Sequence, residues 1–135
     1  MKTRSVVHNT FVIDRTYDAP PARVFAAFAD PAVKAQWFAG PAEWSQEKPK
    51  YDFRVGGRES IGGGPKGGPV HRFDALYYDI VPNERIVYTY DMHMDDARIS
   101  VSLATCEFKA EGKGTRFVYT DGESDRPCLP LLSMK

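Results

Sequence analysis

The residues that could support acid–base or metal chemistry are few and scattered along this chain. The three histidines, His8, His71 and His93, form no Glu-x-x-His pattern and no i, i+4 pair. The run Met92-His93-Met94-Asp95-Asp96 places soft, imidazole and carboxylate ligand types together. It joins two predicted strands, where acidic side chains are commonly solvated, and single ligands without a defined spacing do not indicate a site. The sequence therefore predicts no metal centre and no cofactor.

Two cysteines are present, and neither is placed for nucleophilic catalysis. Cys106 shares one face of a predicted strand with Ala104 and Phe108, which indicates a buried, inert thiol. Cys128 lies near Arg126 in a predicted loop and is the more reactive candidate, but no histidine is placed to activate it. Two cysteines in an intracellular chain of this size also make no disulfide framework. We therefore predict no catalytic residue.

Aromatic side chains suggest a different chemistry, which is the binding of an apolar molecule. The chain holds eight Phe, seven Tyr and two Trp residues, and tyrosine combines an apolar ring with a polar tip that can orient a ligand. Core packing is the plain alternative for each of them. Charged anchors inside such a site could come from long side chains, although these commonly extend toward solvent. The candidates are Arg54, Arg58, Arg72, Arg98 and Glu107.

Two short helices must position part of this aromatic set. A first strand ends at Tyr17, and Asp18 supplies a cap ahead of two prolines that suit a first helical turn. Asp30-Pro31 repeats this pattern for a second helix, which Gly40-Pro41 ends. The apolar helix faces carry Val24, Phe25 and Phe28 in the first helix, and Val33 and Trp37 in the second.

Strands account for the rest of the pattern, because the hydrophobic period changes from 3.6 to 2 after the helices. Residues 61–69 contain five glycines and resemble a phosphate-binding loop, but a strand rather than a helix follows them, so we interpret them as a flexible hairpin. No βαβ alternation occurs, which predicts six or seven antiparallel strands in a meander. The strands after the helices are expected at residues 43–48, 51–55, 70–81, 85–91, 98–108 and 115–120.

Length and charge restrict the function classes further. A chain of 135 residues predicts one domain, residues 1–135, with a single core. Its 18 basic residues balance 18 acidic ones without a basic stripe, which argues against a nucleic-acid partner. There is no apolar run long enough for a signal peptide or a membrane span, so we expect a cytoplasmic protein with no membrane partner.

Five motifs occur in order between residues 10 and 120. They are Asp18-Ala19-Pro20-Pro21-Ala22-Arg23-Val24-Phe25 with Asp30-Pro31, Trp37-Phe38, Asp52-Phe53-Arg54-Val55-Gly56-Gly57, Pro82-Asn83-Glu84-Arg85-Ile86-Val87-Tyr88-Thr89, and Gly114-Thr115-Arg116. With them the chain resembles bacterial proteins similar to the C-terminal domain of the activator of heat-shock protein 90 ATPase, in the START-like or Bet v 1-like (SRPBCC) superfamily. The motifs maintain turns and helix starts, so they identify no active site.

The resemblance implies an α+β helix-grip fold, in which a curved antiparallel sheet with two short helices after the first strand encloses an apolar cavity. It also implies that the second short helix and the central strands line this cavity. We therefore expect a non-catalytic protein that binds a small apolar or aromatic ligand. The alternatives are a protein-interaction module that docks on a chaperone, and a small-molecule cyclase or hydrolase. The candidate ligand-binding residues are Trp37, Phe53, Tyr77, Tyr88 and Tyr90.

The C-terminal segment departs from the family pattern. The family closes its cavity with a long C-terminal helix, but here Pro127 and Pro130 forbid a continuous helix, so the helix is lost or shortened and residues 121–135 are expected to form an irregular tail. Without the helix, Phe53, Tyr88 and Phe117 on the concave face would be exposed. We therefore predict a homodimer that covers the open face or pairs an edge strand, with the tail from Leu129 to Met134 helping to cover it.

Overall fold

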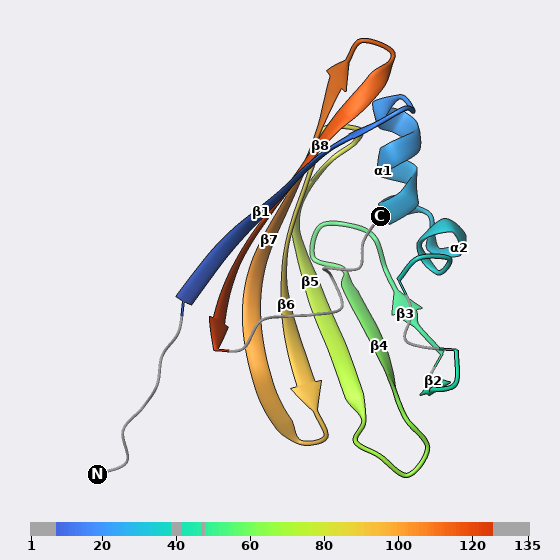
Figure 1. Cartoon of the computed structure of the whole chain (residues 1–135), viewed down its shortest axis with the longest axis vertical. Helices are drawn as coiled ribbons and strands as arrows, with labels where there is room; N and C mark the ends of the chain where they lie inside the picture. The colour runs from blue at the N-terminus through green and yellow to red at the C-terminus, as the bar shows by residue number, and fades with distance from the viewer. Residues whose placement is uncertain (1–7, 39–41, 47, 126–135) are drawn as a thin grey trace.

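One curved antiparallel sheet with two short helices on one face makes up the computed structural model, which describes residues 8–38, 42–46 and 48–125 (Figure 1). The strand order is β1-β8-β7-β6-β5-β4-β2, and β3 also pairs with β4. This confirms the predicted helix-grip fold class. The elements are β1 (His8–Tyr17), α1 (Pro21–Ala29), α2 (Pro31–Lys34), β2 (Ser45–Gln46), β3 (Lys50–Tyr51), β4 (Arg58–Gly64), β5 (His71–Val81), β6 (Arg85–Met94), β7 (Ala97–Glu111) and β8 (Gly114–Asp125).

The two helices begin at prolines, as predicted, but only one of the two predicted caps forms. The Asp30 carboxylate accepts a hydrogen bond from the Ala32 backbone N–H at 2.9 Å and caps α2. The cap predicted at Asp18 is wrong, because Pro20 itself occupies the cap position of α1 in an extended conformation without a side-chain cap. The predicted end of the second helix at Gly40-Pro41 is wrong, because α2 ends at Lys34 and residues 35–38 form turns, so Trp37 lies after the helix and not on its face.

Two strand predictions and one loop prediction are corrected by the structure. The strand predicted at 43–48 is limited to Ser45–Gln46. The strand predicted at 51–55 is limited to Lys50–Tyr51, because residues 52–57 turn back on themselves and the Gly56 N–H donates to the Tyr77 carbonyl at 2.8 Å. Gly56 has a φ of 83°, which glycine adopts without strain. The predicted glycine-rich loop is also shorter than expected, since Gly62 pairs with Arg72 and Gly63 with His71 inside the β4–β5 ladder.

The last strand extends beyond its predicted end. β8 continues to Asp125, so residues 121–125 of the expected irregular tail belong to the sheet. Asp121 pairs with Phe11 of β1 on one side and with Ala104 of β7 on the other. Pairing with β7 along the whole segment, and with β1 as far as Ser124, outweighs the loop-like local composition, because main-chain donors and acceptors gain partners. The remaining tail residues, 126–135, lie outside the described residues.

The core lies between the helices and the face of the sheet turned toward them, which we call the inner face. Phe25 and Phe28 of α1 reach Phe108 of β7 at ring-centroid distances of 5.4 and 5.6 Å. Tyr88 and Phe117 are only 6% and 1% exposed within a single chain, so the open inner face from which we predicted a homodimer is not present at these residues. In the described ranges, no helix has the length and apolar character needed to cross a bilayer.

Candidate functional site

Four of the five predicted ligand-binding residues form a continuous row of aromatic rings on the inner face. Phe53 lies 5.1 Å from Tyr77, Tyr77 lies 5.6 Å from Tyr88, and Tyr88 lies 5.8 Å from Tyr90, measured between ring centroids. Tyr77, Tyr88 and Tyr90 are almost completely buried, whereas Phe53 is partly buried. The structure thus brings these four residues together as one aromatic wall.

Trp37, the fifth predicted residue, joins this wall indirectly. Its ring lies 5.8 Å from Phe38, which lies 4.9 Å from Phe73, and Phe73 lies 5.1 Å from Tyr90. The Trp37 indole N–H donates to the Ala27 carbonyl at 3.0 Å. Trp37 therefore fastens the segment after α2 to α1, and its only donor is already used by the fold.

The tyrosines can lie across the centre of the sheet because β7 carries small side chains there. Tyr88 pairs with Ala104, Tyr90 with Ser102, and Tyr119 with Cys106. All of these residues are buried. Small side chains on the central strand leave space above it, and the long rings of its neighbours on β6 and β8 fill that space.

The tyrosine hydroxyls converge on a buried carboxylate, Asp121. The Tyr119 hydroxyl donates to Asp121 Oδ2 at 2.6 Å, and the Tyr90 hydroxyl donates to the same oxygen. The second oxygen, Oδ1, is buried without a hydrogen-bond partner in the described part of the chain. Burial raises the pKa of Asp121, against the opposing effect of hydrogen bonds from Tyr119, Tyr90 and Ser102.

A buried ion pair lies at the other end of the wall. Lys34 Nζ of α2 contacts Glu59 Oε1 of β4 at 2.6 Å, and the Tyr77 hydroxyl donates to the same oxygen at 2.7 Å. The Lys34 ammonium also lies 5.0 Å from the ring centroid of Phe38 and 4.9 Å from that of Tyr51. This arrangement compensates a buried positive charge with a carboxylate, a phenol and two aromatic faces.

The other titratable groups on the inner face stay protonated at neutral pH. Burial is the largest influence on Tyr77, Tyr88 and Tyr119, and it raises the pKa of each phenol above its ordinary range. Burial also raises the pKa of the Cys106 thiol, which is fully buried as predicted. Neutral phenols and a neutral thiol donate hydrogen bonds but are poor bases and nucleophiles.

The charged side chains that lie on the inner face are not the ones that the sequence suggested as anchors for a ligand. The Arg54 and Arg98 side chains are 68% and 59% exposed, and Arg58 is also exposed. Of the remaining two candidates, Arg72 is partly buried and Glu107 lines an open pocket.

The inner charged and polar groups missed by the sequence reasoning are Lys34, Glu59, Tyr119 and Asp121. The alternation of residues along a strand could have indicated two of them as inward-facing, because Glu59 shares a face with Ile61 and Asp121 shares a face with Tyr119.

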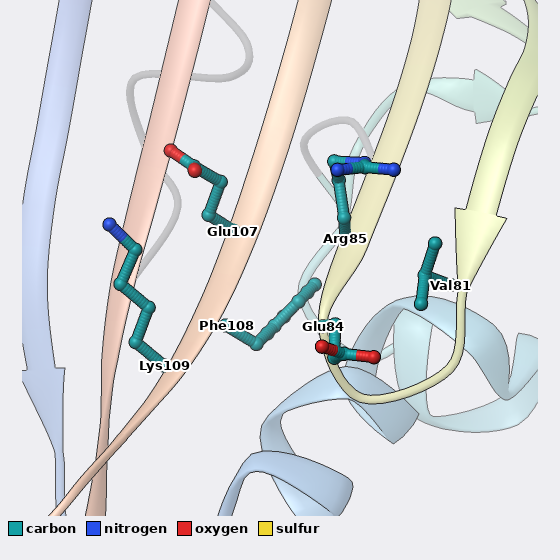
Figure 2. Close-up of a pocket in the computed structure, with 6 residues that line it drawn as sticks. All are labelled: Val81, Glu84, Arg85, Glu107, Phe108 and Lys109. Carbon is teal, nitrogen blue, oxygen red and sulfur yellow. The ribbon is translucent and has the colours of Figure 1, made fainter.

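An open pocket of about 340 Å³ lies where the β5–β6 turn meets β7. Figure 2 shows the ring of Phe108 near Glu84, with Glu107, Lys109 and Arg85 around it. None of the five predicted ligand-binding residues lines this pocket. Its wall combines two acidic and two basic side chains, and Phe108 is only 4% exposed.

The methionine, histidine and aspartate run at 92–96 serves the fold. Asp95 Oδ1 accepts a hydrogen bond from the Val70 backbone N–H at 2.8 Å, which fastens the β6–β7 turn to the start of β5. His93 Nδ1 lies 3.8 Å from Asp74 Oδ2. Within the described ranges, no three His, Cys, Asp or Glu side chains gather as metal ligands do. Cys128 lies outside the described residues.

Solved structures of bacterial proteins share this fold. The protein Mll3558 from Rhizobium loti is 41% identical, with 93% of this chain and 85% of that chain covered and a TM-score of 0.84. A putative uncharacterised protein from Rhizobium leguminosarum is 46% identical, with coverages of 91% and 81% and a TM-score of 0.84. Protein CV1439 from Chromobacterium violaceum is 29% identical, with coverages of 84% and 78% and a TM-score of 0.67.

No curated protein matches the chain. The family model described as "Activator of Hsp90 ATPase homolog 1-like protein" matches residues 18–129, which is most of the sequence. This agrees with the resemblance found from the five motifs, and the fold is the START-like, Bet v 1-like type expected from it. The chain therefore belongs to the family of activator of Hsp90 ATPase homolog 1-like proteins.

Proposed function

We propose that this protein binds a small aromatic molecule on the inner face of its sheet without transforming it chemically. The ligand lies against the aromatic wall formed by Phe53, Tyr77, Tyr88 and Tyr90, with Trp37 at the side of α2. Because the three tyrosines of this wall are at most 6% exposed in the folded chain, the ligand has to displace side chains that pack on them. A hydrogen-bond donor of the ligand faces Asp121. Phe53 and Trp37 are partly buried, so they are the members of the set that an entering molecule reaches first.

The observation that carries this proposal is the unequal use of the two Asp121 oxygens. Oδ2 receives two phenol donors, whereas Oδ1 is buried and accepts no hydrogen bond of normal geometry among the described residues, although the Ser102 hydroxyl is close enough to the carboxylate to lower its pKa. A buried acceptor without a donor costs free energy, on the order of 1–3 kcal/mol. A ligand that places an N–H or O–H at Oδ1 recovers that free energy, whereas a hydrocarbon of the same shape does not.

Indole and indene provide the test, because the two molecules have nearly the same shape and only indole carries an N–H donor. We expect both to raise the melting temperature of the protein, and indole to raise it more at equal concentration. Equal shifts would place the ligand away from Asp121. If neither molecule, nor any compound in a wider aromatic set, changes the melting temperature, the binding proposal is wrong.

Chaperone docking is the second candidate function, and the family description supports it because it names an activator of Hsp90 ATPase. Calorimetric titration of the purified chaperone with this protein tests it. Heat of binding at a stoichiometric ratio would favour docking, whereas its absence beside an indole response would leave ligand binding as the function. The predicted cytoplasmic location stays a prediction.

A cyclase or hydrolase of the same superfamily is the least supported alternative. An enzyme that used an inner phenol or thiol as its base or nucleophile would need that group to ionise near neutral pH, and burial raises the pKa of the inner tyrosines and of Cys106 instead. Turnover that disappears in the Tyr88→Phe variant would favour an enzyme over a binding protein.

A further inference from the structure

The two edges of the sheet differ in length. One edge is formed by β2 and β3, which contain two residues each. The other edge is β1, which contains ten residues and pairs only with β8 (Figure 1). Among the described residues, no strand pairs with the outer side of β1. A long edge strand presents a row of backbone donors and acceptors that is ready to pair with another chain.

Exposed apolar side chains mark the same edge. Val12, near the middle of β1, is 59% exposed, and Leu103 and Val101 of β7 are 52% and 40% exposed. Leu103 pairs with Gly122 of β8, which pairs with Thr10 of β1. Because Gly122 has no side chain, only small or apolar groups occupy the outer face between Leu103 and the edge. β1 contains no proline, and its charged residues, Asp14 and Arg15, lie on the C-terminal side of Val12.

We propose that β1 pairs with β1 of a second copy, antiparallel and with Val12 opposite Val12 of that copy. The two sheets then form one continuous sheet across a twofold axis. In an antiparallel pair, directly opposed residues point to the same face of the sheet. The twofold axis therefore has to pass through a residue position and not between two neighbouring residues. This condition restricts the register to a few choices.

Side-chain chemistry selects Val12 among these choices. An axis at Asp14 places two carboxylates opposite each other, and an axis at Ile13 places Val12 opposite Asp14. An axis at Phe11 shortens the pairing to residues 8–14. The axis at Val12 pairs residues 8–16, places Phe11 opposite Ile13 and sets Thr10 opposite Asp14.

The charges of β1 are compatible with this register. The Asp14 carboxylate already accepts hydrogen bonds from the Arg116 guanidinium of its own chain at 2.6 and 3.0 Å. It therefore carries no uncompensated charge into the interface. Arg15 faces Asn9 of the second copy, so no like charges oppose each other. The strand is self-complementary, which a twofold interface requires.

Two cysteine variants in a Cys128→Ser background test the register. We expect Val12→Cys to form a disulfide-linked dimer under mild oxidation, because directly opposed Cα atoms in antiparallel strands are about 4.5–5.5 Å apart and suit a disulfide. Asp14→Cys is the matched control on the same face of the same strand. Its copies are offset by four residues, about 13 Å, and are expected to stay unlinked.

Light scattering on the unmodified protein tests the association itself. We expect a mass of twice the 15.2 kDa of one chain at tens of micromolar. Val12→Lys should have the mass of a single chain. Its melting temperature should equal that of the unmodified protein after dissociation into single chains. A single-chain mass for the unmodified protein overturns the proposal. A Val12→Lys protein that stays dimeric, or an Asp14→Cys variant that links as readily as Val12→Cys, overturns it as well.

Discussion

Buried polar groups are the most unusual feature of this protein at the scale of single residues. Lys34, Glu59 and Asp121 are 8%, 5% and 0% exposed, and each lies among aromatic rings. Tyrosine hydroxyls hydrogen-bond both carboxylates, and the Lys34 ammonium neutralises one of them. The inner face therefore combines an apolar wall with two polar points, which is the composition of small-molecule sites.

The pH dependence of stability provides a residue-scale prediction for Asp121. Its pKa is raised in the folded protein, so its contribution to stability is complete below the unfolded pKa of about 3.9 and is lost as pH rises through the folded pKa. We expect the wild type to lose stability relative to Asp121→Asn as pH rises above about 4. Urea unfolding of both proteins across this pH range measures the difference.

Asp14 serves as a control of opposite sign. The hydrogen bonds from Arg116 lower the pKa of this exposed carboxyl, so its contribution is present above the unfolded pKa and is lost as pH falls. The wild type should therefore gain stability relative to Asp14→Asn as pH rises. The same slope for both variants would contradict the assignment of a raised pKa to Asp121.

The buried ion pair gives a second residue-scale prediction. Lys34→Met leaves Glu59 buried without its partner, and we expect a loss of about 3 kcal/mol in the free energy of unfolding. The double variant Lys34→Met/Glu59→Gln removes both charges and should recover a large part of that loss. Arg54→Met, which breaks an exposed pair with Asp52, is the control and should cost less than about 1 kcal/mol. A double variant no more stable than Lys34→Met would contradict this account.

Long strands were predictable at the scale of elements, whereas short segments were not. β5, β6 and β7 alternate buried residues with more accessible ones over residues 73–77, 86–92 and 100–108, and that period is visible in the sequence. The turn at 52–57 depends on Gly56 bonding to Tyr77, which is distant in the sequence. The end of β8 likewise depends on pairing with two other strands.

Helix capping provides an element-scale prediction. α2 contains four residues and depends on the Asp30 cap for its first turn. Asp30→Ala should lower the free energy of unfolding by about 1 kcal/mol, whereas Asp18→Ala should change it by less than about half of that. Chemical denaturation of the two variants compares them directly, and equal losses would show that Asp18 has a role that its position outside the cap does not explain.

At the scale of the whole molecule, the family and the curved sheet were predictable from five ordered motifs, but only part of the candidate site was. Aromatic residues such as Tyr88 were identified because they lie on central strands of a recognised fold. Asp121 was assigned to an irregular tail, since an acidic residue beside glycine is typical of a loop. Its place inside the protein depends on pairing with β1 and β7 and on the hydroxyl of Tyr90, which are distant in the sequence, and on the hydroxyl of Tyr119, which reaches Asp121 only because both lie on β8.

The central claim is that Asp121 orients an aromatic ligand on the inner face. Asp121→Asn tests it, because the tyrosine donors hold the amide oxygen at the Oδ2 position and the amide N–H₂ then replaces the Oδ1 acceptor. Asp91→Asn, at a partly exposed carboxylate paired with Arg98, is the matched control.

Calorimetric titration with indole and indene measures the preference directly. For the wild type and for Asp91→Asn, we expect indole to bind roughly fivefold to tenfold more tightly than indene. This ratio corresponds to one additional hydrogen bond that contributes about 1 kcal/mol or slightly more. For Asp121→Asn, the two affinities should become equal or reverse. An indole preference that survives in Asp121→Asn would contradict the account.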